Sequence, residues 1–245
     1  MTFNIGKCKV LHAGYNNPGF QYNMNGTVLS EAEDEKDLGI RITRSLKPSM
    51  HCREAAAKAN GVLKQILNAF HYRDRHTFLG LYKQYVRPHL EFASCAWSPW
   101  TNEDIETIEK IQKRAVSLIS GLQGPNYEDK LKELRLDSLK DRRVRADMIQ
   151  VYKILNGIDA VDSNTWFLTA GTLNRRATRL MTFDKNIIAR RSRLEIRRNF
   201  FSQRVVNKWN ELPLIVKNSK TLAAFKYRYD NNLVRFGASA ADNID

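Results

Sequence analysis

The stretch 101–121, TNEDIETIEKIQKRAVSLISG, decides the kind of fold that this chain adopts. Its apolar residues recur in steps of three and four, which places them on one face of an α-helix. Thr101 and Asp104 match a capping box, the acids come early, the basic residues come late, and Gly121 supplies a stop. The stretch therefore predicts an amphipathic helix with an apolar face, the most clearly marked helix of the chain.

The same period recurs upstream of this helix. It predicts one helix over about 49–70 and a second that opens at Asp74. Pro88 should kink or end the second helix, because proline removes a backbone donor and clashes with the preceding turn. The inward faces are expected to hold Ala55, Ala59, Val62, Ile66 and Phe70 in the first helix, and Phe78, Leu81, Tyr82, Tyr85 and Val86 in the second.

Downstream, the pattern predicts a short helix near 127–134 and a longer one from Ser138, with Asp141 as its capping-box partner, to about Gly157. Residues 158–196 have no clean period and predict loops with one or two short strands. Two further helices are expected, one over 199–212 and one that opens at Ser219. Their inward residues are Phe201, Val205, Trp209, Leu212, Leu222, Phe225 and Tyr229.

Residues 1–46 predict β structure instead. Short apolar segments flank Asn25-Gly26, a dipeptide that strongly signals a two-residue hairpin. An acidic run at 30–37 precedes the strand-like segment 38–43. We expect a small antiparallel unit that is too small to be stable alone. The predicted fold class is therefore mainly α with a small N-terminal antiparallel β unit, that is, α+β.

Positive charge is concentrated in the last third of the chain. Of a net charge of +14, residues 175–228 carry fifteen Lys and Arg against three acids, whereas the rest carries 25 basic and 23 acidic residues. Such a cluster is typical of a protein that binds a polyanion, because each neutralised phosphate releases counterions. The residues expected to contact phosphate are Arg190, Arg191, Arg193, Arg197, Arg198, Arg204 and Lys208.

Aromatic residues interleave with these cations, and this arrangement allows two interpretations. Aromatic faces beside cations bind single strands without sequence preference. Four of the six aromatic residues lie at helical spacing, however, which favours a place in the core. The six are Phe200, Phe201, Trp209, Phe225, Tyr227 and Tyr229.

The sequence contains no recognisable catalytic motif: it lacks GxSxG, GxxxxGK[ST], HExxH and GxGxxG. The five histidines show no metal-ligand spacing. The acidic run would suit magnesium only if its side chains converged, and a solvated loop is expected instead. No metal or cofactor site is therefore expected in this chain. The acids of the run are Glu31, Glu33, Asp34, Glu35 and Asp37.

Cysteine usage and hydropathy point to an intracellular chain. Cys8, Cys52 and Cys95 stand far apart without CxxC spacing, so they are expected to be buried thiols. No apolar run approaches the roughly 20 residues of a membrane helix, and the first ten residues lack the apolar region of a signal peptide. We expect the nucleus or the cytoplasm, with no membrane span.

A series of segments, in order along the chain, carries a resemblance to a known family. The segments are FNIGKCKVLHAG (3–14), YNMNGTVLSEAEDEKDLGIRIT (22–43), AAAKANGVLKQI (55–66), LYKQYVRPHLEFASCAWSPW (81–100), IEKIQKRAVSLISG (108–121), LKELRLDSLKDRRVRADMIQVYKILNG (131–157) and RRNFFSQRVVNKWNELP (197–213). Together they resemble the C-terminal part of a non-LTR (LINE-type, jockey-like) retrotransposon reverse transcriptase. The likeness extends from about Phe3 to Leu233.

The resemblance implies roles for particular residues. The segment 3–14 looks like the motif that follows the catalytic strands of the palm, so Lys7, with Lys9 as the other candidate, would lie near the incoming nucleotide. DLGIRI at 37–42 resembles the primer grip, which assigns Asp37, Leu38 and Gly39 to that hairpin. The implied parts are a palm remnant (1–46), a thumb-like helical bundle (47–125), a helical connector (126–174), a basic C-terminal region (175–235) and a disordered tail (236–245).

The sequence also departs from the family. Reverse transcriptases use two Mg²⁺ ions held by carboxylates, one set on a Tyr/Phe-x-Asp-Asp turn, and no Asp-Asp pair occurs here. The resemblance therefore implies a truncated fragment that binds RNA or DNA template-primer but does not polymerise on its own. Its partners would be nucleic acid, the missing reverse-transcriptase core, or a second copy through the β remnant.

Two alternatives to this reading stay open. A basic helical scaffold could bind an acidic protein or an anionic membrane surface, since polybasic patches suit either partner. A degenerate open reading frame would have no function at all.

Overall fold

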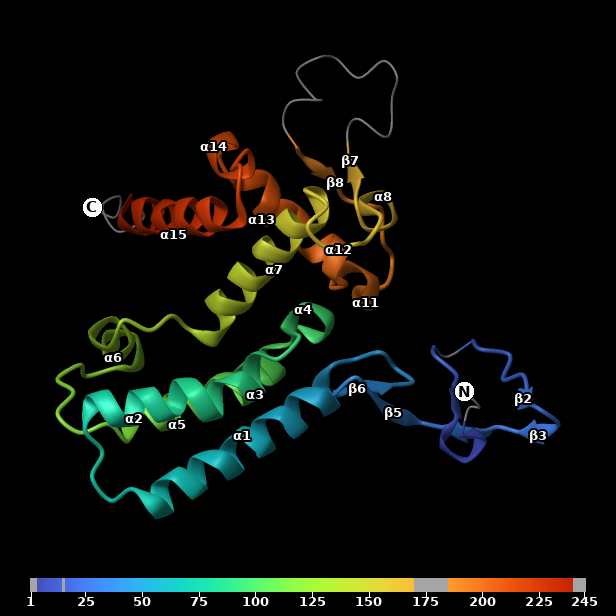
Figure 1. The fold of residues 1–245 in the computed structure, drawn as a ribbon, viewed down its shortest axis with the longest axis horizontal. Coiled ribbons are helices and arrows are strands. Elements are labelled where there is room, and N and C mark those ends of the chain that lie inside the picture. The colour runs from blue at the N-terminus through green and yellow to red at the C-terminus, as the bar shows by residue number, and fades with distance from the viewer. Residues whose placement is uncertain (1–3, 15, 170–184, 240–245) are drawn as a thin grey trace. The chain divides into compact units, whose positions relative to one another are not determined.

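The computed structural model describes residues 4–14, 16–169 and 185–239, with side chains described as far as Asn231 (Figure 1). The chain forms two compact units, Met1–Asp141 and Arg142–Asp245. The fold is mainly helical with small two-stranded sheets, which confirms the predicted fold class. Within the described part of the chain, no helix has the length and apolar character needed to cross a membrane.

The first unit begins with β structure. After a 3-10 turn, η1 (Ile5–Lys7), come β1 (Lys9–Leu11), β2 (Asn23–Met24), β3 (Thr27–Val28), β4 (Ser30–Ala32), β5 (Asp34–Asp37) and β6 (Ile40–Thr43). The β2–β3 and β5–β6 pairs are antiparallel, as expected, whereas β1 pairs with β4 in parallel. The acidic run, which was expected to be a solvated loop, instead forms β4 and β5, because its backbone pairs with β1 and β6.

Both hairpins turn through two residues with positive φ. Asn25 and Gly26 have φ of 50° and 79°, which confirms the hairpin predicted from this dipeptide. Leu38 and Gly39 have φ of 46° and 89° between β5 and β6. This geometry matches the twist of the flanking strands, but a leucine adopts it only at a cost in backbone strain. The β5–β6 hairpin thus holds a leucine in an unfavourable conformation at its tip.

The helices of the first unit follow the predicted order. They are α1 (Ser49–Ala69), α2 (Arg75–Leu81), η2 (Tyr82–Val86), α3 (Arg87–Glu91), α4 (Ser94–Trp97), α5 (Asn102–Ser117) and α6 (Tyr127–Leu134). Pro88 lies in the first turn of α3, which begins at Arg87 directly after the π-helical η2, so the regular α-helix is interrupted just before the proline. Proline has no amide hydrogen to donate to the carbonyl of the preceding turn, and a π turn is one of the irregularities that accompany such a break in a helix. Helix α5 ends four residues before Gly121.

The core of the first unit lies where α1 packs against α5, α3 and η2 (Figure 1). Its centre includes Cys52, Ala59, Leu63, Val86 and Ile108, all fully buried. Two predicted core positions were wrong. Phe70 and Tyr85 are 41% and 54% exposed, because α1 ends at Ala69 and Tyr85 lies within the π turn, where the α-helical period does not hold.

Helix α7 (Leu139–Leu155) crosses the boundary between the two units, and Ser138 and Asp141 form the predicted capping box at its start. The second unit continues with α8 (Ser163–Trp166), β7 (Leu168–Thr169), β8 (Ile187–Ile188), α11 (Glu195–Arg198), α12 (Phe201–Arg204), α13 (Val206–Glu211), α14 (Leu214–Lys217) and α15 (Leu222–Ser239). Strands β7 and β8 are antiparallel.

The second unit corrects several predicted boundaries. The helix expected over 199–212 begins at Phe201 and is interrupted at Val205, so it forms α12 and α13. The last helix begins at Leu222 rather than Ser219, because the Thr221 hydroxyl accepts from the Ala224 amide and caps it there. Of the expected disordered tail 236–245, residues up to Ser239 belong to α15, and the remainder lies outside the described residues.

The core of the second unit is aromatic. Tyr152 of α7 stacks on Phe225 of α15 with ring centroids 4.4 Å apart, and Trp209 of α13 lies 6.0 Å from the same ring. The Tyr229 ring stacks on Phe225 as well, with centroids 6.0 Å apart. The Tyr152 hydroxyl donates to the Ser219 carbonyl at 2.6 Å. Three of the interleaved aromatics, Trp209, Phe225 and Tyr229, therefore serve the core, as their helical spacing favoured.

Candidate nucleic-acid interface

Residues 190–198, which we call the arginine segment, run from the end of β8 through α11. The segment has a fixed backbone at its start. The Asn210 side chain of α13 accepts from the Ile187 amide at 3.0 Å and donates to the Ile187 carbonyl at 2.8 Å, as a neighbouring strand would. Gln203 Oε1 accepts from the Arg190 amide at 2.9 Å. Two side chains from α12 and α13 therefore hold the backbone from which the arginines project.

The arginine segment carries five arginines and too few acids to neutralise them. Glu195 is its single acid. No salt bridge between described residues involves any of its five arginines, and all five side chains belong to exposed residues. Exposed guanidinium groups without a carboxylate partner can form bidentate hydrogen bonds with phosphate oxygens. The five are Arg190, Arg191, Arg193, Arg197 and Arg198.

Arg204 has a different place from the five. Its Nε and Nη2 donate to both carboxylate oxygens of Asp147 on α7 at 2.9 Å each, and its Nη1 donates to the Asn199 carbonyl at 3.2 Å. The arginine side chain is 17% exposed and the aspartate side chain 9%. Arg204 therefore links α12 to α7 through an ion pair. Because Asp147 already neutralises its charge, Arg204 is not among the phosphate contacts that we propose.

Lys208 keeps a solvent-facing position on α13. Its ammonium lies 3.1 Å from Glu211, and both side chains are 62% exposed. Exposed pairs of this kind contribute little to stability and exchange partners readily. Lys208 therefore remains a candidate for a phosphate contact.

An aromatic stack borders the arginine segment. The rings of Trp166 on α8 and Phe200 are nearly parallel, at 5° and a centroid distance of 6.2 Å. The guanidinium carbon of Arg197 lies over the Phe200 ring at 5.0 Å from its centroid. Phe200 is 42% exposed, whereas Phe201 beside it is buried. The sequence analysis did not single out Trp166, because the residues around it lack any helical or strand period.

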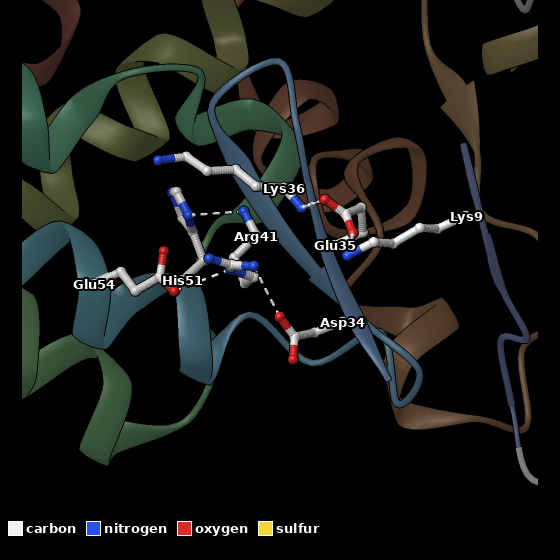
Figure 2. Close-up of polar contacts among 7 residues, drawn as sticks. All are labelled: Lys9, Asp34, Glu35, Lys36, Arg41, His51 and Glu54. Carbon is white, nitrogen blue, oxygen red and sulfur yellow. Dashed lines mark hydrogen bonds and ion pairs between the residues drawn. The ribbon is translucent and has the colours of Figure 1, made fainter. Parts of the chain in front are cut away.

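The β5–β6 hairpin is tied to α1 through Arg41 (Figure 2). The Arg41 guanidinium contacts Asp34 at 2.8 Å and Glu54 of α1 at 2.9 Å. The Arg41 amide donates to Nδ1 of His51 at 3.2 Å. His51 is buried and packs edge-on against Trp97 with centroids 4.6 Å apart. The hairpin is thereby fixed to the first turns of α1.

The primer-grip-like residues occupy the tip of this hairpin. Asp37 is the last residue of β5 and is exposed, and Leu38 is 86% exposed in the turn. At Gly39, an added Cβ would lie 3.3 Å from the Phe92 ring, which is a tight contact, and the φ of +89° would strain any other residue. The three residues thus form a protruding tip beside Phe92.

Lys7 and Lys9 differ in their surroundings. Lys7 ends η1 and is exposed. The Lys9 ammonium lies 3.1 Å from Glu35 of β5 (Figure 2). The hydrogen bond from Lys9, followed by one from the Lys36 amide, lowers the pKa of the Glu35 carboxyl below its ordinary value. Lys9 therefore joins β1 to β5, and Lys7 is the more accessible of the two.

The remaining acids of the acidic run face basic partners rather than one another. Glu31 lies 3.6 Å from His12, and Glu33 lies 3.4 Å from Arg44. Among the described residues, no group of three or more His, Cys, Asp or Glu side chains is arranged to hold a metal ion. Of the three cysteines, Cys52 is buried, whereas Cys8 and Cys95 are half-buried, which corrects the expectation for those two.

A second basic surface lies in the first unit and was not expected. An open pocket forms between α1 and α5, with small residues on the α1 side and basic residues on the α5 side. Arg114 donates to Asn60 Oδ1 across it at 2.7 Å. Its lining residues are Ala56, Ala57, Asn60, Thr107, Lys110, Ile111, Lys113, Arg114 and Ser117.

No protein-family model, curated protein or solved structure matches this chain.

Proposed function

We propose that this chain binds RNA or DNA through the arginine segment, with Lys208 as an additional phosphate contact. The observation that carries the proposal is the set of five exposed arginines without an acidic partner among the described residues. Holding like charges close together costs free energy unless an anion neutralises them. A phosphate chain supplies several anions at a regular spacing and gains entropy by releasing its counterions.

The resemblance to a non-LTR reverse transcriptase supports the same proposal. In that reading, the β5–β6 hairpin acts as a primer grip, the helices of the first unit act as a thumb, and the arginine segment extends the template-binding surface. These 245 residues contain no Asp-Asp pair to hold catalytic Mg²⁺. We therefore propose that the chain binds template-primer and does not extend a primer by itself.

The dependence of affinity on salt tests this proposal. The purified chain is titrated into a labelled single-stranded oligonucleotide at increasing salt, with fluorescence anisotropy as the readout. Five phosphate contacts on a single strand should give a slope of log K against log salt of about −3 to −4. A slope near zero contradicts phosphate binding.

A competition experiment distinguishes nucleic acid from an acidic protein or an anionic membrane as the ligand of this basic surface. Unlabelled single-stranded RNA, a polyglutamate chain and phosphatidylserine vesicles are each added to the preformed complex. We expect the RNA to displace the probe at the lowest anionic charge concentration. If the vesicles or polyglutamate displace it as well at equal charge, the chain is a general polyanion scaffold and the proposal is wrong.

A further inference from the structure

We propose that the stack of Trp166, Phe200 and Arg197 receives an unpaired base, so that the chain binds single-stranded nucleic acid in preference to a duplex. This inference rests on the proposed function, since the arginine segment supplies the phosphate contacts that bring a strand to the stack. It adds a second kind of contact, between ring faces, that phosphate binding does not require.

The geometry of the stack carries the inference. Trp166 and Phe200 lie within 5° of parallel, and the guanidinium carbon of Arg197 lies over the Phe200 ring at 5.0 Å from its centroid. The two rings therefore adjoin the arginine segment, to which Arg197 belongs. Phe200 is 42% exposed, which is high for a phenylalanine with two flat neighbours.

The local backbone explains why this ring is presented to solvent. Phe200 has φ −64° and ψ 144°, an extended conformation that separates α11 from α12. In a continuous helix, Phe200 and Phe201 would lie at adjacent positions about 100° apart, with both close to the core face. The extended residue instead buries Phe201 in the core and leaves Phe200 on the surface beside Trp166.

The charges around the stack determine which occupant suits it. An exposed apolar ring alone would suit a protein partner, but here the flanking residues are arginines. Bases of a single strand stack on aromatic rings next to cations, and each such contact contributes about a tenfold gain or more in affinity. In a duplex, the base faces are already stacked on one another and are unavailable to Phe200.

The test compares a thymidine homo-oligomer with an abasic oligomer of the same length, which keeps the phosphates and removes the bases. We expect the wild-type chain to bind the thymidine oligomer about tenfold more tightly. In the variant Phe200→Leu, the affinity for thymidine should fall to that for the abasic strand, while abasic binding stays unchanged. Phe200→Tyr, which keeps a ring, should retain the preference.

Tyr227→Leu is the matched control. Tyr227 is also an exposed aromatic of the second unit, at 71%, but it lies on α15 and no ring contact involves it among the described residues. This variant should keep the full preference for thymidine. If Tyr227→Leu removes the preference as Phe200→Leu does, the contact is not specific to the stack.

The wild-type comparison separates the two proposals without depending on any variant. Equal affinity for the two oligomers, with a steep salt dependence, overturns base stacking and leaves phosphate binding intact. Failure to bind either oligomer overturns the proposed function itself.

Discussion

Arg204 and the arginine segment show how neighbouring arginines take different roles. The Arg204 guanidinium pairs with Asp147 and donates to a backbone carbonyl, so its charge is already neutralised within the second unit. Among the residues that the structure describes, the five arginines of the segment have no acidic partner. Sequence alone does not separate these two states, because both kinds of arginine belong to the same basic cluster.

We predict that Arg204→Ala lowers the free energy of unfolding by about 3 kcal/mol, because it leaves the carboxylate of Asp147 nearly buried without its partner. Urea denaturation measures the change. The double variant Arg204→Met with Asp147→Leu should recover most of the loss, since removing both charges also removes their desolvation cost. A loss of nucleic-acid affinity in the double variant, at full stability, would instead make Arg204 a ligand contact.

At the scale of elements, a buried hydrogen-bond network joins α5, α6 and the start of α7. The Tyr127 hydroxyl donates to Glu109 and accepts from Gln112 Nε2 at 2.8 Å. Glu109 also accepts from the Leu139 amide at 3.1 Å, and Gln112 Nε2 donates to the Asp137 carbonyl at 3.0 Å. Burial, together with the hydrogen bond to Glu109, raises the pKa of Tyr127 well above its ordinary value.

Tyr127→Phe should therefore lower the free energy of unfolding by about 1–3 kcal/mol, because Glu109 loses a donor while it remains buried. Urea denaturation of the full chain provides the measurement. Tyr85→Phe is the control: Tyr85 is 54% exposed, and its variant should differ from wild type by less than about 0.5 kcal/mol. Equal effects of the two substitutions would show that the network adds nothing.

The contact between the β5–β6 hairpin and α1 should depend on pH through His51. Burial lowers the pKa of His51, the positive charges of Lys36 and Arg41 lower it further, and Glu54 of α1 opposes the shift. The folded state therefore favours the neutral ring, whose Nδ1 accepts from the Arg41 amide. Below the unfolded pKa of about 6.5, protons bind the unfolded chain first, so stability falls as the pH decreases.

The measurement is urea denaturation between about pH 7.5 and 5, with His51→Gln as the comparison. We expect the stability of the wild type to decrease below about pH 6.5 more steeply than that of the variant. Parallel curves for the two proteins would contradict this role of His51.

The elements that the sequence predicts well are those with local signals. Helices α5, α6 and α7 begin where Thr101, Asn126 and Ser138 cap them, and each cap accepts from an amide three residues on. Hairpin β2–β3 follows from Asn25-Gly26 in the same way. In each case, two or three neighbouring residues suffice to determine the geometry.

The features that the sequence analysis missed depend on residues far apart in the chain. The break at Phe200 accompanies a stack on Trp166, 34 positions earlier. The parallel β1–β4 pair and the pairing of the acidic run with Lys9, His12 and Arg44 are also non-local. For the site, charge clustering located the arginine segment, but it could not show that Arg204 is held by Asp147 on α7.

At the scale of the whole molecule, the β region and the helices of the first unit differ in how much buried packing supports them. Residues 9–43 form two-stranded sheets of two to four residues per strand, and each strand leaves one side without a described backbone partner. Such small sheets are marginal on their own and offer edges to another chain. By contrast, α1 and α5 bury a continuous apolar interface.

We therefore predict that amides of 9–43 exchange with deuterium faster than those of α1 and α5 in the monomeric chain, because local opening there breaks few buried contacts. Hydrogen exchange followed by mass spectrometry gives the comparison, and sedimentation establishes the oligomeric state. A dimer that protects this region would support pairing through the sheet edges. Slow exchange in a monomer would contradict the prediction.

The central claim is that the arginine segment, and not the general basic character of the chain, binds a phosphate backbone. It is tested most directly by two triple variants with the same change in net charge, titrated with a single-stranded oligonucleotide over a range of salt. One carries Arg190→Gln, Arg191→Gln and Arg193→Gln; the other carries Lys64→Gln, Lys132→Gln and Lys140→Gln, all exposed residues of the first unit. We predict that the first reduces the magnitude of the salt slope by about 2 and that the second leaves it nearly unchanged. Equal slopes for the two variants would contradict the account.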